Sequence, residues 1–229
     1  MALPSAVAVM TLSNAILFPQ AMLPLYIFEP RYRRMLADCL ETHRMFAVAM
    51  QRPGAKREIP SNIAGLGLVR ASVDNKDGTS HLILQGLMRV ELMETVRYKP
   101  YRLQRIRPLE TTGADSVAVD ALTAKVLDLV AERFQQGFEL PVQVLDQLAK
   151  IEPSAKSFAD SLTLKHVIRY LNKLEDPDHL ADLVSYTLLP TAVQRQTILE
   201  TTNLEARLKC LIHFLIAEIS RSGEKGTHE

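Results

Sequence analysis

The stretch from Leu12 to Leu36, LSNAILFPQAMLPLYIFEPRYRRML, constrains the fold more than any other part of the chain. Its two apolar runs, Ala15–Phe18 and Ala21–Phe28, are interrupted by Pro19 and Pro24. Proline cannot donate to a strand ladder and is not tolerated inside a helix. The two runs are therefore predicted to be short strands or extended segments at sheet edges and bends.

A helix is predicted from Glu29 to Thr42, beginning inside this stretch, because Pro30 suits the first helical position. The apolar residues that follow recur at a spacing of three and four, which places them on one helical face. They are Tyr32, Met35, Leu36, Cys39 and Leu40. The stretch is thus expected to be extended, bent, extended again and then helical, with one apolar side throughout.

The order of these residues resembles the opening motif of the Lon substrate-binding domain, the N-terminal domain of Lon proteases. Leu17-Phe18-Pro19 is followed by Leu23-Pro24-Leu25 and then by Glu29-Pro30-Arg31-Tyr32. That domain also occurs as a stand-alone protein, which this chain resembles, and in substrate receptors such as cereblon. The resemblance implies an α+β fold with a PUA-like β-barrel, one inserted helix and a C-terminal α-helical bundle. The residues alone predict only an α+β core.

A series of strands is predicted around this motif, with a hairpin turn at 74–78 and a bulge or sharp bend at Gly86. The predicted strands are Ala6–Leu12, Met45–Met50, Ile63–Val73, Ser80–Tyr98 and Tyr101–Pro108. Leu82, Ile83 and Leu84 are apolar on both faces, which predicts a central strand. Leu84–Val90, with Gly86 and Arg89, resembles a strand motif of the same family.

Beyond Gly113 the apolar spacing becomes helical. Helices are predicted over 119–134 with Gly137 as C-cap, from Pro141, over about 157–174, from Asp176-Pro177, and from the capping boxes Thr191-x-x-Gln194 and Thr202-x-x-Glu205. The expected organisation is a barrel subdomain over residues 1–112, a helical bundle over 113–222 and a disordered polar tail over 223–229.

Composition fits an ordinary soluble globular protein, with 47% hydrophobic and 23% charged residues. The net charge of +1 provides no global field that would attract nucleic acid or an anionic membrane. Residues 1–28 carry no charge, but they lack a basic leader and contain three prolines, so we expect core strands rather than a signal peptide or membrane span. The cytoplasm is the expected compartment.

Catalytic and metal-binding patterns are missing from the sequence. There is no GxxxxGK[ST] phosphate loop, GxSxG elbow or HExxH pair, and we expect neither the ATPase nor the serine–lysine protease module of a Lon protease. Cys39 and Cys210 are far apart and neither belongs to a CxxC pair, so no zinc site is expected. Cys39 is predicted to be a small buried hydrophobe. We expect no enzyme activity, no cofactor and no metal.

The resemblance implies non-catalytic binding of unfolded or partner polypeptides, carried by exposed apolar groove residues. The alternative is an RNA-binding module on the strand from Arg97 to Arg107, whose cations and aromatics alternate. That strand could equally be a solvated face. By analogy with cereblon, a small-molecule receptor is a third class of function. The candidate binding residues are Arg31, Arg89, Arg97, Tyr98, Tyr101 and Arg105. Whether the chain forms a weak homo-oligomer is left open.

Two charge pairings are also predicted. Arg31, Arg33 and Arg34 lie at a helix N-terminus, where positive charge is unfavourable, so either acidic side chains such as Glu29 or an acidic ligand must offset it. We expect the partner to be intramolecular. Glu29 is further expected to pair with Arg89, unless both point to solvent.

Overall fold

The structure, a computed structural model, describes residues 3–114, 117–136 and 169–225. The chain divides into two compact units. The β unit comprises Met1–Glu110 together with Thr191–Glu200, and the helical unit comprises Thr111–Pro190 together with Thr201–Glu229. The predictions for Gly137, for the helix from Pro141 and for most of the helix over 157–174 lie outside the described residues, as does the end of the tail.

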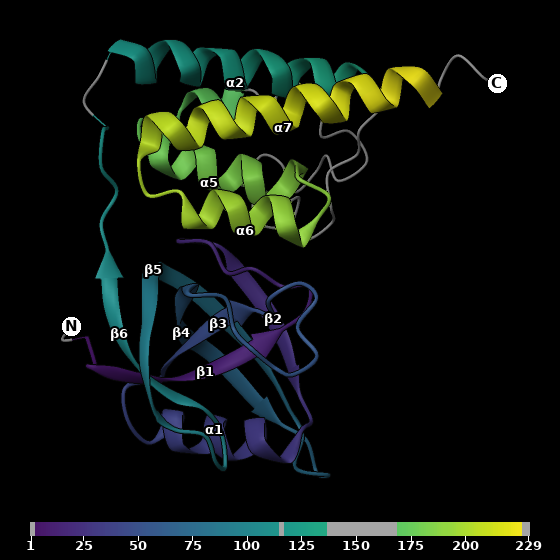
Figure 1. Cartoon of the computed structure of the whole chain (residues 1–229). Coiled ribbons are helices and arrows are strands. Elements are labelled where there is room, and N and C mark those ends of the chain that lie inside the picture. The colour runs from purple at the N-terminus through teal and green to yellow at the C-terminus, as the bar shows by residue number, and fades with distance from the viewer. Residues whose placement is uncertain (1–2, 115–116, 137–168, 226–229) are drawn as a thin grey trace. The chain divides into compact units, whose positions relative to one another are not determined.

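The described residues of the β unit form a mixed sheet with the order β2-β5-β4-β3-β1-β6. Its strands are β1 (Ala6–Leu12), β2 (Met22–Ile27), β3 (Met45–Met50), β4 (Ile63–Asp74), β5 (Ser80–Arg97) and β6 (Leu103–Leu109). An additional pairing between β5 and β6 bends the sheet into an unevenly closed, barrel-like ring (Figure 1). Among the described strands of this sheet, only β1 and β3 pair in parallel. The predicted α+β class and the predicted strands are confirmed.

The long strand β5 allows this uneven closure because different parts of it pair with different neighbours. Its first third pairs with β2 and its second half pairs with β6. Between these two parts of β5, its pairing with β4 skips Leu87. As a result, Leu66 lies opposite Met88 while Gly67 lies opposite Gly86. A residue without a partner bends a strand locally. The bulge predicted at Gly86 is confirmed.

The first apolar run lies inside the core without pairing as a strand. Leu17 and Phe18 are fully buried. A Cβ atom added at Gly65 would overlap the carbonyl oxygen of Leu17, and one added at Gly86 would overlap that of Phe18. The backbone of Gly86 also donates to the Ala21 carbonyl at 2.9 Å. This extended segment therefore packs directly on the strand backbones, where glycine alone leaves room.

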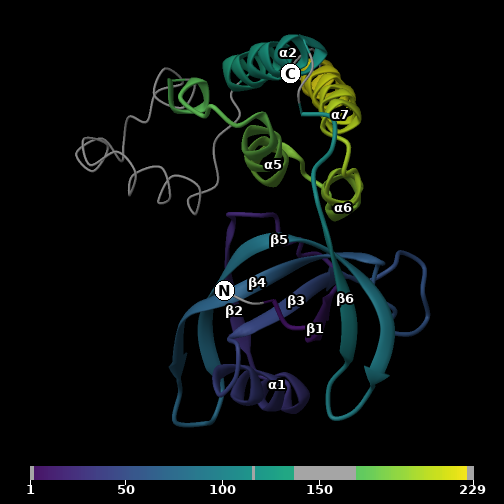
Figure 2. The same ribbon diagram turned by 90° about the vertical axis from the view of Figure 1, so that its left-hand side faces the viewer.

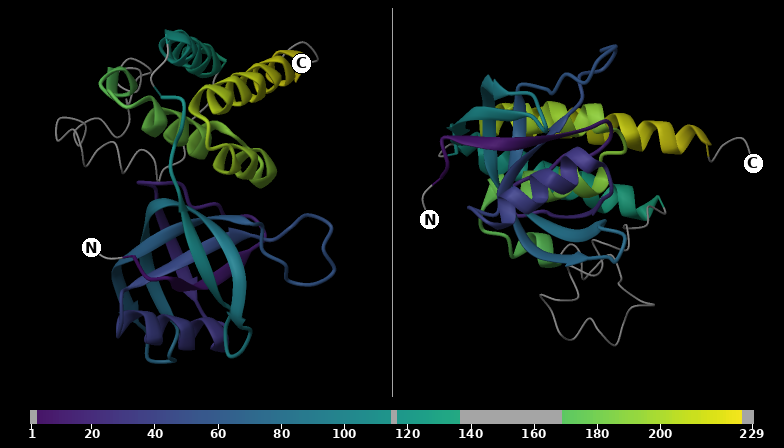
Figure 3. Two further views of the ribbon diagram at one scale, coloured as in Figure 1. Left: turned by 60° about the vertical axis from the view of Figure 1, so that its left-hand side comes forward. Right: turned by 90° about the horizontal axis from the view of Figure 1, so that it is seen from below.

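Helix α1 (Pro30–Leu40) lies across one end of the ring (Figures 2 and 3). Its buried side chains, Tyr32, Met35, Leu36 and Cys39, belong to the same core cluster as residues of β3 and β5. The Tyr32 hydroxyl is within hydrogen-bond distance of both backbone groups of Thr11 in β1. Tyr101 donates to Asp38 Oδ2 at 2.8 Å. The predicted helix and its inward face are confirmed.

Helix α6 (Ala192–Glu200) groups with the β unit, whereas the predicted bundle ran without interruption from 113 to 222. The predicted capping box begins it, because Gln194 N donates to Thr191 Oγ1 at 3.2 Å and Thr191 N donates to Gln194 Oε1 at 3.2 Å. Side-chain hydrogen bonds attach the helix to the strands. Gln196 Nε2 donates to the Ile63 carbonyl at 2.9 Å, and Arg89 Nε donates to the Leu199 carbonyl at 3.0 Å.

The helical unit packs α2 (Val117–Gln135), α5 (Pro177–Leu188) and α7 (Leu204–Lys225) together. Asp176 caps α5 by accepting from Asp178 N at 2.9 Å, as Asp176-Pro177 predicts. Helix α7 is capped by Asn203, which accepts from Ala206 N at 2.9 Å, one residue after the predicted Thr202. Asparagine is at least as good an N-cap as threonine, so the helix begins one position later.

The helical unit contains a buried ion network that was not predicted from the sequence. The Arg207 side chain is fully buried and contacts the carboxylates of Asp178 and Asp182. Its Nε atom donates to the Thr201 carbonyl at 2.7 Å. A buried guanidinium needs this many acceptors, since an uncompensated charge in the interior is very costly.

Candidate functional site

Arg105 and Arg107, two cations of the predicted basic strand, pair with carboxylates of the β unit. Arg105 Nε donates to Glu94 Oε1 at 2.6 Å, and Arg107 Nε donates to Glu91 Oε2 at 2.9 Å. These pairs join neighbouring strands β6 and β5. The carboxylates reduce the positive potential that a phosphate backbone would meet.

The aromatic residues next to this strand also make contacts within the protein. The Arg97 guanidinium lies 4.6 Å from the centre of the buried Tyr101 ring. Burial, and then the hydrogen bond to Asp38, raises the pKa of Tyr101 to about 12. Tyr98 is exposed, with the Arg102 guanidinium 5.1 Å from its ring centre. Of the two tyrosines predicted to stack on bases, only Tyr98 presents its ring to solvent.

The remaining two predicted site residues, Arg31 and Arg89, have protein partners. Arg31 donates to Glu29 Oε2 at 2.9 Å and also contacts the carboxylate of Glu58. Burial acts to lower the pKa of Arg31, but these carboxylates outweigh it and the pKa is raised. The predicted intramolecular compensation is confirmed for Arg31. Arg89 is only 3% exposed and donates to the Leu199 carbonyl of α6. Glu29 accepts from Arg31, so the two residues that were predicted to pair with each other bond to different partners.

An exposed apolar surface covers the outer side of β2, β5 and the end of β4. In register, Tyr26 lies opposite His81, which lies opposite Val73. Pro24 lies opposite Ile83, which lies opposite Ala71. We call this surface the apolar face, defined by Pro24, Tyr26, Phe28, Ala71, Val73, His81 and Ile83.

The side chains of the apolar face are large and accessible. Exposed fractions are 48% for Tyr26, 59% for Phe28, 64% for Val73 and 36% for Ile83. The Tyr26 ring centre lies 5.8 Å from that of Phe28 and 4.7 Å from that of His81. Most of these residues surround a shallow hollow of about 420 Å³. Beside them, β2 ends the strand order of the described sheet.

Sequence reasoning expected exposed apolar residues but did not locate them. The prediction of a central strand at Leu82–Leu84 is confirmed, since β5 lies between β2 and β4. Leu82 and Leu84 point into the core, whereas Ile83 is exposed. When both faces of a strand are apolar, alternation cannot tell which face meets solvent. The available signal was the run Pro24, Tyr26, Phe28 at every second position.

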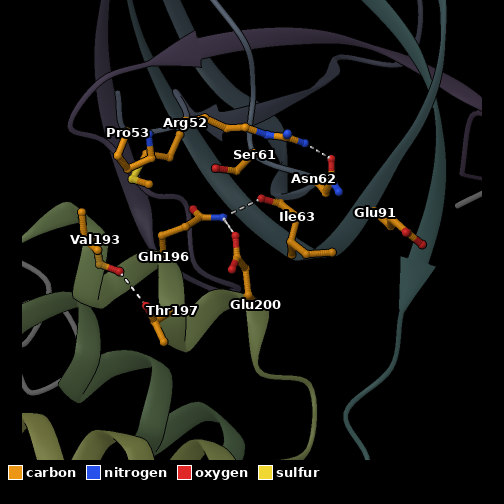
Figure 4. Close-up of a pocket in the computed structure, with 11 residues that line it drawn as sticks. Arg52, Pro53, Ser61, Asn62, Ile63, Glu91, Val193, Gln196, Thr197 and Glu200 are labelled. Atoms are coloured by element: carbon orange, nitrogen blue, oxygen red, sulfur yellow. Dashed lines mark hydrogen bonds between the residues drawn. The ribbon is translucent and has the colours of Figure 1, made fainter. Parts of the chain in front are cut away.

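A second hollow, of about 670 Å³, lies between α6 and the strands of the β unit (Figure 4). We call it the polar pocket. Its polar side chains are Arg52, Ser61, Asn62, Glu91, Gln196, Thr197 and Glu200. Arg52 Nη2 donates to Asn62 Oδ1 at 2.5 Å, and Gln196 Nε2 donates to Glu200 Oε1 at 2.8 Å. Sequence analysis gave no indication of this pocket.

Neither hollow contains an arrangement typical of a catalytic or metal centre. Within the described residues, no group of three or more histidine, cysteine, aspartate or glutamate side chains could hold a metal ion. Burial, followed by the charge of Asp38, raises the pKa of Cys39 to about 12. Its thiol therefore stays protonated at neutral pH, as a small buried hydrophobe should. None of the described helices has the length and apolarity needed to cross a membrane.

Comparison with known proteins gives consistent results along the chain. The family model of the ATP-dependent protease La (LON) substrate-binding domain matches residues 6–217. The Lon protease of Dictyoglomus thermophilum is 22% identical over 220 residues, which cover 95% of this chain and 25% of that protein. The Lon protease of Anaeromyxobacter dehalogenans is 26% identical over 220 residues, covering 93% of this chain and 23% of that protein. The chain thus spans about a quarter of the length of these relatives.

Two solved structures share the fold. The N-terminal domain of the Mycobacterium avium complex Lon protease superimposes with a TM-score of 0.65 at 18% identity, covering 92% of this chain and 97% of that one. A Lon N-terminal domain protein from Xanthomonas campestris gives a TM-score of 0.60 at 19% identity, covering 92% of this chain and 99% of that one. With the family model matched over nearly the whole chain, the protein belongs to the Lon substrate-binding domain family.

Proposed function

We propose that this chain is a non-catalytic recognition module that binds unfolded or partner polypeptides through the apolar face. The observation that carries the proposal is the exposure of Tyr26, Val73 and Ile83 on adjacent strands, together with Phe28 directly after β2. An antiparallel sheet with one solvated face normally carries polar residues there. A contiguous apolar surface on a folded protein is typical of an interaction site.

Two properties of the apolar face suit a polypeptide in particular. Aromatic and aliphatic side chains of an unfolded segment can pack on Tyr26, Val73 and Ile83, where binding depends on buried area rather than on one charge. The free side of β2 offers main-chain groups to an extended segment, as in strand addition to a sheet edge. Pro24 within β2 removes one donor there and limits indiscriminate pairing.

The family supports the same class of ligand, since its model describes a substrate-binding domain of an ATP-dependent protease. The polypeptides bound are then candidate clients of proteolysis. The described cysteines, Cys39 and Cys210, are both free thiols, which fits the proposed cytoplasmic location.

A matched pair of valine substitutions tests the proposal. Val73 belongs to the apolar face, whereas Val96, 52% exposed near the far end of β5, does not. Val73→Ser should weaken binding of a fluorescent, permanently unfolded polypeptide about threefold to tenfold, because a buried valine side chain contributes roughly 1 kcal/mol when only partly covered. Val96→Ser should leave the dissociation constant unchanged. Equal effects of the two substitutions in fluorescence anisotropy would reject the apolar face as the site.

A further inference from the structure

The side of β2 that faces away from β5 has no partner strand in the described sheet. The strand order ends at β2, which pairs with β5 alone. Directly before β2, the Ala21 carbonyl accepts from Gly86 N of β5 at 2.9 Å. The main-chain groups of successive residues in a strand point alternately to its two sides. Those of Met22, Pro24 and Tyr26 therefore point away from β5, to the free side of β2.

The position of Pro24 agrees with this alternation. Proline has no N–H, so at a residue facing β5 it would remove a hydrogen bond from the ladder. At Pro24 the missing donor falls on the free side instead. Within β2, the free side thus offers the carbonyl oxygens of Met22, Pro24 and Tyr26, but the N–H groups of Met22 and Tyr26 alone.

The residues of β2 with free main-chain groups also contribute side chains to the apolar face. Pro24 and Tyr26 are exposed, whereas Ile27 is buried in the core and Leu25 packs against it. Side chains along a strand alternate between the two faces of a sheet. A strand added beside β2 would therefore continue the ladder and also place every second side chain next to Tyr26, on the apolar face. In strand addition, the main-chain bonds supply affinity and the alternate side chains supply specificity.

A second copy of this chain suits the free side of β2 less well than a separate segment does. Two copies that paired through β2 about a two-fold axis would each bring Pro24 into the same ladder. That ladder would lack two donors over the six residues of β2. An extended segment from another polypeptide meets a single missing donor, and its own N–H groups can donate to all three free carbonyls.

We propose that a bound polypeptide joins the sheet as an added strand on the free side of β2. The ligand is an extended segment of about five residues, the span from Met22 to Tyr26, with apolar side chains at every second position. Its main-chain N–H groups must be available on the side that meets β2. The inference rests on the proposed function, since it takes the apolar face as the surface that receives the alternate side chains.

Three fluorescent peptides of one sequence, with leucine and serine alternating, test the proposal on the full chain. One is unmodified, one is N-methylated at its leucine amides, and one carries the same number of methyl groups at its serine amides. Because only one of these two sets of amides can face β2, one methylated peptide should bind about tenfold or more weakly in fluorescence anisotropy. The other should bind within about threefold of the unmodified peptide. Equal dissociation constants for the two methylated peptides overturn the proposal.

A matched pair of proline substitutions tests the protein side of the ladder. Pro24→Val keeps an apolar side chain and adds an N–H to the free side, so the unmodified peptide should bind about threefold to tenfold more tightly. Pro53→Val adds an N–H in the loop after β3 and should leave the dissociation constant unchanged. Unchanged or weaker binding by a folded Pro24→Val variant contradicts the added strand. If that variant proves unfolded, the methylated peptides decide alone.

Sedimentation of the unmodified protein tests the other occupant. A dimer that the unmodified peptide does not dissociate would place a second copy on β2 and overturn the proposal. Failure of this inference also differs from failure of the proposed function. Methylated peptides that bind equally, yet are weakened by Val73→Ser and not by Val96→Ser, leave the apolar face as the site and remove only the added strand. Equal effects of the two valine substitutions on the unmodified peptide remove the apolar face itself.

Discussion

Gly65 and Gly86 determine whether the segment Ile16–Phe18 can enter the core of the β unit. Each glycine lies under a backbone carbonyl of that segment, so even one methyl group would overlap it. Backbone carbonyls cannot move aside as a flexible side chain can. The absence of a side chain at these two glycines is therefore as important to this core as the apolar side chains of the segment.

Gly86→Ala should lower the free energy of unfolding by more than about 3 kcal/mol, since the strand or the buried segment must shift. Gly54→Ala is the control. Gly54 has a φ of 74° but nothing within 4 Å of an added Cβ, so only the left-handed backbone penalty of about 1–2 kcal/mol applies. Urea unfolding monitored by circular dichroism measures both. Similar losses for the two variants would show that the segment does not lie on Gly86.

Individual residues were predictable from sequence where their partners lie nearby. The carboxylate of Glu29 beside Arg31 follows from the unfavourable positive charge at the N-terminus of a helix, and the inward side of Cys39 follows from helical spacing. The partner of Arg89 was not predictable, because Leu199 is 110 positions away and contributes a backbone carbonyl, which leaves no pattern in the sequence. Gln196 and Arg207 were missed for a related reason, since polar residues on a helix are by default expected to face solvent.

Helix α1 is the element on which the closed end of the ring depends. Tyr32, Met35, Leu36 and Cys39 reach the same core cluster as Phe46 and Leu84. Its opposite face carries Arg34, which pairs with Asp38 at 3.0 Å in solvent. The helix thus separates a structural face from a solvated one.

Leu36→Ala should lower the free energy of unfolding by about 2–5 kcal/mol, as expected for a buried leucine whose removal leaves a cavity. Arg34→Ala on the same helix should change it by less than about 0.5 kcal/mol, because an exposed ion pair contributes little. Chemical denaturation of both variants provides the comparison. A loss below about 0.5 kcal/mol for Leu36→Ala would place α1 away from the core.

Strands and helices were predicted well because turns and proline mark their ends. The bounds of β1 and β3 agree with the structure, and the hairpin turn after β4 contains Gly78 at a φ of 78°. It was harder to predict from the sequence which elements pack together. Helix α6 shows the same helical spacing whether it packs on helices or strands, and only long-range contacts decide. The apolar face was hidden for the same reason, because exposure is a property of the assembled sheet.

The chain as a whole has a net charge of +1, and its basic strand β6 is compensated by β5. Together with membership of the Lon substrate-binding domain family, this favours polypeptide over RNA as the ligand. The RNA-binding alternative stays a prediction with a distinct physical signature.

Binding of an unfolded polypeptide to the full chain should change less than about threefold between 50 and 200 mM salt, because apolar contacts release few counterions. An RNA ligand held by three or more phosphate contacts should lose more than about tenfold over the same range. Fluorescence anisotropy titrations with both ligands, at matched protein concentrations, compare the two. Tight, steeply salt-dependent RNA binding with no polypeptide binding would replace the proposed function.

The bond from Arg89 to the Leu199 carbonyl has a consequence for the order of events during synthesis. The strands are complete once residue 109 has been made, but α6 is not available until about residue 200. At about 5–20 residues per second, the ribosome needs roughly 5–20 s to produce the intervening chain. During that interval the guanidinium of Arg89 lacks its final acceptor, and the nascent barrel exposes the surface that α6 later covers. A fragment that stops at residue 112 would remain in this incomplete condition permanently.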